Sequence, residues 1–251
     1  MKRVVTMCAL VAMGLLSVAP ALAQTADDVI EKHLAAIGGR AALAKATSQV
    51  ATGTVVLSTQ GMDIGGTVEV YRKAPNKSRS LLKLDLSAVG GSEMVVDQRC
   101  DGKTGFASNS MQGDREITGD QLQGMLNNTF PTSLLNYKDA GAKVELTGKD
   151  KVGDRPVFVL LYTPKAGPAT RMFIDAETYD ILRSVTKLNV PAAGGEVEQT
   201  NEVGDFRDVG GIRMPFRVTT VSPSQTLSIT LAKIEINAPI DDAMFARPGA
   251  K

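Results

Sequence analysis

The stretch GTVEVYRKAPNKSRSLLKLDL (Gly66–Leu86) decides the fold class, because two runs of alternating residues flank a segment that contains proline. In the second run, leucines alternate with Lys83 and Asp85. Apolar residues at every second position bury one face of a strand and leave the other in solvent. The stretch therefore predicts two antiparallel strands, whose apolar faces carry Val68, Val70, Leu82, Leu84 and Leu86.

Similar runs recur along most of the chain, each bounded by Gly, Pro or Asp. Turn signals about 8–12 residues apart are typical of an antiparallel sandwich or barrel. The segment DREITG (114–119) is interpreted as an edge strand or a turn. No linker, charge block or repeat divides the chain. The prediction is a mainly β (α+β) protein with one antiparallel domain, 24–251, of about eleven strands.

Two regions have helical periodicity instead. The first begins at Thr25, which can cap it, and ends at Gly38-Gly39; RAALAKA (40–46) forms a short second helix. The second, 120–128, interrupts the strands. Pro131 ends it, and TSLLNYK (132–138) is predicted to resume it. Two glycines weaken this helix, so a mobile cover and a fixed helix both fit. Its apolar side carries Leu122, Met125 and Leu126.

The first 23 residues have the layout of a secretory signal peptide. Lys2 and Arg3 precede an apolar run, 4–18, and the triplet Ala21-Leu22-Ala23 follows it. The run is short for a membrane span, which needs about 20 residues. Cleavage before Gln24 would leave a nearly neutral chain without a basic stripe, which argues against nucleic acid as a partner. The expected location is the periplasm.

The segment FIDAETYDILRSV (173–185) concentrates acidic residues, with Asp154 nearby. Asp175, Glu177 and Asp180 could act as an acid and base pair or as metal ligands. Alternatively, they turn the chain between two strands, since Asp at the first position of a turn can accept from the backbone two residues on. The flanks are strands without a glycine-rich loop or a second acidic motif. The turn is therefore favoured.

Other candidate reactive groups lack the partners that their chemistry requires. His33 is the only histidine, and a zinc site needs three or four good ligands. No serine motif accompanies it, so it is interpreted as a packing or helix-surface residue. Cys100 has no C-x-x-C partner. Gly210-Gly211 fits a hairpin turn better than a phosphate loop, since no helix follows. The sequence predicts no catalytic residue, metal or cofactor.

The apolar strand faces then offer two interpretations: a packed core, or the lining of a lipid cavity. The chain has no tryptophan, few aromatic residues and ten methionines. A flexible aliphatic lining suits an acyl chain. At about 0.8 kcal/mol per buried methylene, ten methylenes contribute at most about 8 kcal/mol. The candidate cavity residues are Val55, Leu57, Val68, Val70, Leu82, Leu84, Leu86, Met94, Val96, Phe158, Leu160, Met172 and Ile174.

Several segments together carry a resemblance to a known superfamily. They are VIEKHLAAIGGRAALAKATSQVATGTV (29–55), GTVEVYRKAPNKSR (66–79), VVDQRCDGKTGF (95–106), FIDAETYDILRS (173–184), DFRDVGGIRMPFRV (205–218) and KIEINAPIDDAMFARP (233–248). Through these segments the chain resembles the periplasmic outer-membrane lipoprotein-sorting proteins of the LolA/LolB-like superfamily. None of the segments is a catalytic signature.

The resemblance implies a half-open antiparallel β-barrel around an apolar cavity, with helix 120–128 as a lid. It implies a non-enzymatic periplasmic carrier or binder of lipid or lipoprotein acyl chains, with an inner-membrane donor and an outer-membrane acceptor. In such carriers an arginine on an early strand holds the lid shut; Arg72 and Arg79 are the candidates here. The alternatives are an envelope-stress sensor or regulatory binding module on the same fold, a hydrolase, or a packed barrel with a structural role only.

Overall fold

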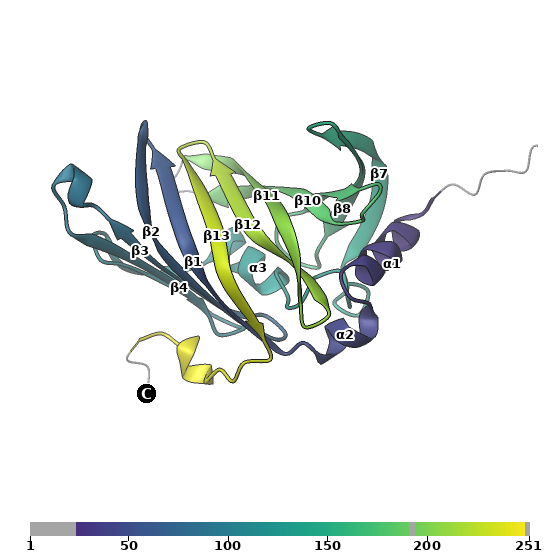
Figure 1. The fold of residues 1–251 in the computed structure, drawn as a ribbon, viewed down its shortest axis with the longest axis horizontal. Coiled ribbons are helices and arrows are strands. Elements are labelled where there is room, and N and C mark those ends of the chain that lie inside the picture. The colour runs from purple at the N-terminus through teal and green to yellow at the C-terminus, as the bar shows by residue number, and fades with distance from the viewer. Residues whose placement is uncertain (1–23, 191–193, 249–251) are drawn as a thin grey trace, which may run out of the picture.

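The computed structural model describes residues 24–190 and 194–248, so the predicted signal peptide, 1–23, lies outside the described residues (Figure 1). The described part contains one thirteen-stranded sheet and three α-helices. The helices are α1 (Ala26–Ala36), α2 (Arg40–Lys45) and α3 (Gly119–Asn127). The strands are β1 (Ser48–Thr59), β2 (Met62–Lys73), β3 (Lys77–Asp85), β4 (Glu93–Cys100), β5 (Gly105–Asn109), β6 (Gly113–Ile117), β7 (Lys143–Val152), β8 (Arg155–Thr163), β9 (Thr170–Asp175), β10 (Ile181–Val190), β11 (Gly195–Val209), β12 (Ile212–Ser222) and β13 (Gln225–Ile236).

The sheet is antiparallel and open, in the order β6-β5-β4-β3-β2-β1-β13-β12-β11-β10-β9-β8-β7. Its two edges, β6 and β7, are consecutive in the chain, and α3 lies on the connection between them (Figure 1). The prediction of a mainly β, antiparallel fold is therefore confirmed, and the sheet is open where a half-open barrel was predicted. The predicted number of about eleven strands was too low, because short ambiguous segments form full strands. DREITG is one of them: β6 pairs five residues with β5.

One face of the sheet is concave and curls around α3 (Figure 1). Residues directly opposite each other in adjacent antiparallel strands lie on the same face. Val55 is opposite Gly66, Gly66 is opposite Leu84 and Leu84 is opposite Met94, so all four lie on the concave face. A bulge at Thr52/Gly53 bends β1 against β13. A Cβ at Gly53 would lie 2.2 Å from a backbone oxygen of β13, so only glycine fits this tight bend.

Two apolar clusters fill much of the concave side. The first joins α1, α2 and the segment after α3 to β8 and β9, around Ile30, Leu34, Leu43, Leu134 and Leu160. The second joins the concave faces of β1–β3 to β12 and β13 and contains Ala51, Val55, Val68, Leu82, Leu84, Phe216, Leu231 and Ile234. A third, small cluster lies on the convex side of β8–β10. Because the sheet curls, its own side chains pack against each other in the second cluster.

The predicted helices are present, with one exception. Thr25 caps α1: its Oγ1 accepts from the amide of Asp28, whose carboxylate accepts from the Thr25 amide in return. Helix α3 corresponds to the predicted helix 120–128. The predicted resumption over 132–138 is wrong: these residues form successive turns, closed by bonds such as Ala142 N to Tyr137 O. No helix in the described part of the chain is long and apolar enough to span a bilayer.

The C-terminal segment 238–248 folds back onto the convex face of β2–β5. Phe245 is 1% exposed. Arg99 donates to the carbonyl oxygen of Ala246 at 3.0 Å and, with Arg79, holds the buried Asp97 carboxylate at 2.7–2.8 Å. Lys73 and Lys77 both pair with Asp242. Segment 238–248 therefore stabilises β2–β5 from the convex side.

Candidate functional site

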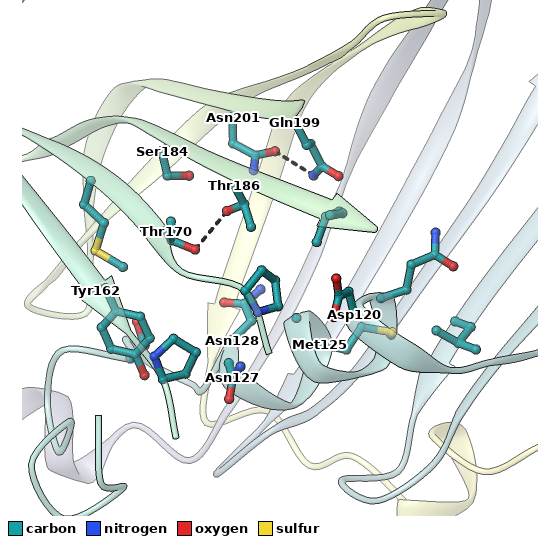
Figure 2. A pocket seen from close by; sticks show the side chains of 18 of the residues that line it. Asp120, Met125, Asn127, Asn128, Tyr162, Thr170, Ser184, Thr186, Gln199 and Asn201 are labelled. Carbon is teal, nitrogen blue, oxygen red and sulfur yellow. Dashed lines mark hydrogen bonds between the residues drawn. The ribbon is translucent and has the colours of Figure 1, made fainter. Parts of the chain in front are cut away.

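A cavity of about 440 Å³ lies between α3 and the concave face of β8–β11, with β4 and β6 on its far side (Figure 2). This volume falls within the usual range of small-molecule sites, roughly 300–1,000 Å³. The residues that line it are Gln98, Arg115, Ile117, Asp120, Gln121, Gly124, Met125, Asn127, Asn128, Ser133, Tyr162, Pro164, Pro168, Thr170, Met172, Ile181, Ser184, Thr186, Leu188, Gln199 and Asn201.

Helix α3 covers the cavity without being buried itself. None of its residues is buried, and it has nine residues, short of the roughly 12–15 that an isolated helix needs. Arg115 of β6 bonds Gln121 on one side, and two further bonds attach the helix to the β8–β10 side. Asp120 Oδ2 accepts from the backbone amide of Asn189 at 2.9 Å, and Asn127 Nδ2 donates to Ala166 O at 2.9 Å. Helix α3 is thus a thin bridge across the open side of the sheet.

The cavity lining is half polar, and its polar groups are mostly neutral. On the sheet side, hydroxyl and amide side chains come from β9, β10 and β11 (Figure 2). On the helix side stand the amides of Asn127 and Asn128. Two charged side chains belong to the lining: Asp120 has the bond described above, and Arg115 donates to the neutral amide oxygen Gln121 Oε1 at 3.2 Å.

Most of the predicted cavity residues lie in the packed clusters. Val55, Val68, Leu82 and Leu84 are buried in the second cluster, and Leu57, Val70, Met94 and Val96 pack against it. Phe158, Leu160, Met172 and Ile174 belong to the first cluster, and Leu86 is buried at the β3–β4 turn. Only Met172 of the thirteen lines the cavity described here. A lipid-lining role for the other twelve stays a prediction.

The predicted lid residues lie on a covering helix, as the sequence indicated. Met125 lines the cavity, and Leu122 packs toward Gly105 and Ile117 at the β5–β6 edge. Leu126 is half-buried, and its carbonyl oxygen accepts a long bond from Asn76 Nδ2 at 3.5 Å. That the helix opens as a lid stays a prediction.

The acidic cluster forms a turn. Asp175 Oδ1 accepts from the amides of Glu177 and Thr178 at 2.9 and 2.7 Å, and Oδ2 pairs with Arg155 at 2.7 Å. Burial alone would raise the pKa of Asp175, but these two amides and Arg155 bring it below its usual value. Asp180 pairs with Arg213 through both oxygens. The favoured turn interpretation is confirmed for Asp175.

The other singled-out residues are structural in position. His33 is 3% exposed; its Nδ1 donates to Tyr179 O at 2.7 Å, and burial lowers its pKa. Cys100 is buried, and burial raises the pKa of its thiol. Gly210-Gly211 forms the turn between β11 and β12. Among residues 24–190 and 194–248, no group of three or more His, Cys, Asp or Glu could hold a metal ion.

Of the two candidate arginines, only Arg72 faces the concave side. Arg79 lies on the convex face, bound to Asp97. Arg72 is opposite Gln49 and two positions beyond Val70, so it shares their concave face. Burial lowers its pKa, and no ion pair or hydrogen bond to another described residue offsets this. Arg72 does not line the cavity.

Solved structures share the fold of this curled antiparallel sheet. A LolA superfamily protein from Nitrosomonas europaea matches with a TM-score of 0.56 and 11% identity, over 90% of this chain and 99% of that one. A DUF1329 family protein from Desulfovibrio piger matches with a TM-score of 0.55 and 13% identity, over 88% and 96%.

A domain named for outer membrane lipoprotein sorting, from Vibrio parahaemolyticus, matches with a TM-score of 0.54 and 9% identity, over 87% of this chain and 94% of that one. The predicted resemblance to the LolA superfamily is thus confirmed at the level of the fold. No model of a protein family matches the chain, and no curated protein matches its sequence.

Proposed function

We propose that the protein is a non-enzymatic carrier or binding protein for lipids or lipoprotein acyl chains in the bacterial envelope. The observation that carries the proposal is the cavity of about 440 Å³ beneath α3 in a LolA-like sheet. A concave site in which apolar side chains and convergent polar groups meet is a common form of ligand pocket. The fold shared with a LolA superfamily protein and with a domain named for outer membrane lipoprotein sorting supports this class of ligand, and the signal-peptide layout of residues 1–23 supports a periplasmic location.

The proposed route into the cavity is displacement of α3. The helix carries no buried residue, and its anchors are few side-chain hydrogen bonds, each worth roughly 0.5–1.5 kcal/mol net. A segment attached this weakly can open without unfolding the sheet. Exchange with an inner-membrane donor and an outer-membrane acceptor is the corresponding proposal for its partners.

The test is to extract the natively purified protein with solvent and to identify lipids by mass spectrometry, alongside titration with a fluorescent fatty acid. Met125→Trp places a large side chain into the cavity and is expected to reduce the extracted lipid and the fluorescent signal at least tenfold. Met111→Trp is the matched control, because Met111 is 67% exposed at a hairpin tip. Protein that carries no lipid and binds no fatty acid would refute the proposal.

A further inference from the structure

Strands β10 and β11 turn polar side chains toward the concave side of the sheet, and β10 turns apolar side chains toward the convex side. On β10, Ser184 and Thr186 face the concave side, whereas Val185 is 7% exposed in the convex cluster with Phe173. On β11, Gln199 and Asn201 also face inward. A strand normally turns its apolar side chains toward the interior. Ser184, Thr186, Gln199 and Asn201 are half-buried, so the concave face of β10 and β11 is a polar wall of the cavity and not a part of the apolar core.

These side chains form one contiguous surface, which we call the polar block. It consists of Thr170, Ser184, Thr186, Gln199, Asn201 and Thr220, on the four adjacent strands β9–β12. The register places Thr170 opposite Thr186, Thr186 opposite Gln199, and Ser184 opposite Asn201, which in turn lies opposite Thr220. Directly opposite side chains lie about 4.5–5.5 Å apart at Cβ. All but Thr220 line the cavity, and Figure 2 shows them together on its sheet side.

The polar block satisfies only part of its own hydrogen-bonding capacity. Thr170 and Thr186 share a bond of 2.8 Å between their hydroxyls. Asn201 Oδ1 accepts from Thr220 Oγ1 at 2.7 Å and from Gln199 Nε2 at 3.4 Å. Among the described residues, nothing pairs with Asn201 Nδ2, Gln199 Oε1 or Ser184 Oγ. Donors and acceptors therefore remain side by side, facing the cavity.

The polar block carries no ionisable group. Hydroxyls and amides each donate and accept, which matches a ligand hydroxyl, itself both donor and acceptor. A charged headgroup would find no counter-charge in the block, and burying an unpaired charge costs far more than burying a hydroxyl. The charged side chains of the cavity lining, Arg115 on β6 and Asp120 on α3, lie outside the block, and Arg72 lies outside the lining altogether. The chemistry of the block thus selects against ions.

We propose that the cavity binds the uncharged, hydroxyl-rich headgroup of an amphiphile, such as an acylglycerol or a glycolipid. The polar block would replace the water around the headgroup, and the start of the acyl chain would contact Met125, Met172 and Leu188. This inference rests on the proposed function, since it assumes a lipid ligand. It adds that the polar end of the ligand, rather than its tail, occupies the described cavity.

The test compares amphiphiles that share a dodecyl chain: dodecyl maltoside, dodecyl phosphate and dodecyltrimethylammonium, each below its critical micelle concentration, with free maltose as a fourth probe. Isothermal titration calorimetry on the full-length mature protein measures binding. The expected result is that the maltoside binds at least tenfold more tightly than either charged probe, and that maltose alone shows no measurable binding.

Two variants locate the headgroup, with a matched control on the opposite face. Thr186→Val and Asn201→Leu remove polar atoms from the block, and each is expected to weaken maltoside binding about tenfold, while leaving the weak binding of dodecyl phosphate unchanged. The control is Thr200→Val, which makes the same chemical change as Thr186→Val at the residue next to Asn201 on β11. Thr200 is opposite Val185 on the convex side, so no change is expected.

Each contrary outcome has a distinct meaning. If no dodecyl probe binds, the proposed lipid function fails together with this inference. If dodecyl phosphate binds tightest and Arg115→Gln or Arg72→Gln abolishes that preference, the ligand is an anionic lipid and only the inference is refuted. If maltose binds as tightly as the maltoside, the site recognises a free sugar, and both proposals are refuted. Equal losses in Thr186→Val and Thr200→Val also refute the inference.

Discussion

Gly124 offers a direct way to change the stability of α3 without changing its contacts. It lies in the helix interior, and a Cβ built there meets no atom within 4 Å. Gly124→Ala therefore introduces no clash and is expected to stabilise the helix by about 0.8–1.0 kcal/mol. Because 1.4 kcal/mol is a factor of ten, this lowers the population with an unwound α3 about fivefold.

The consequence for ligand exchange depends on the route. If a ligand enters and leaves only when α3 unwinds, association and dissociation both slow about fivefold, since α3 is folded in the free and the bound protein alike. Gly124 lines the cavity, so a direct effect of the added methyl group on binding would instead change the dissociation constant. Stopped-flow mixing with a fluorescent fatty acid measures both rates. Hydrogen exchange of the α3 amides reports independently whether the helix became more stable.

The matched control is Gly65→Ala, which makes the same change in β2, where a Cβ also meets no atom within 4 Å. It should leave both exchange rates as they are. A clear rise in α3 protection in Gly124→Ala, together with unchanged rates of ligand exchange, would refute the idea that unwinding of α3 admits the ligand.

Three further changes test the supporting structure. Asp97→Ala leaves two arginines without their shared carboxylate and should lower the free energy of unfolding by about 3–5 kcal/mol in urea titrations; a loss below about 1 kcal/mol would contradict the buried ion cluster. The depressed pKa of Asp175 stabilises the fold above its usual pKa of 3.8, and this contribution disappears as pH falls through the lower folded value. In Asp175→Asn the decline of the melting temperature on acidification should therefore be shallower. Likewise, the pKa of His33 in the folded protein is below 6.5, so the free energy of unfolding should fall as pH drops below 6.5. His33→Asn should remove this fall, and a variant with the same pH profile as the unmodified protein would contradict the role given to His33.

The sequence predicted the sheet well, because period-two alternation reports local burial. GTVEVYRKAPNKSRSLLKLDL forms β2 and β3 as expected, and Leu84 is 1% exposed while Lys83 is exposed. The same pattern could not tell whether an inward leucine lines a void or packs against another strand. That depends on the curl of the sheet, which brings β3 close to β12 and β13, far away in the chain. Long-range packing of this kind leaves no mark on local periodicity.

The polar residues of the described cavity were not predicted for a related reason, because the prediction followed the apolar strand faces. The pattern that indicates this cavity is polar residues on strands inside the sheet. In DILRSVTKLNV, Ser184 and Thr186 alternate with Val185, so two faces are distinguishable, but nothing local says which is inward. In EVEQTNEV both faces of the strand are polar, which is unusual for a strand in the middle of a sheet. A polar central strand was therefore the available indication of Gln199 and Asn201.

The distribution of stability over the fold indicates where movement occurs. Uncurling the sheet would separate the buried second cluster, with Val55, Val68 and Leu84 each about 1% exposed. Burial of one such side chain contributes roughly 1.5–3 kcal/mol, so this separation is costly. Phe245 and the Asp97 cluster brace the same strands from the convex side. Helix α3 has no buried residue. We therefore expect the sheet to hold the polar block in a fixed arrangement while α3 moves, and a preorganised polar site loses less free energy in ordering when it binds a ligand.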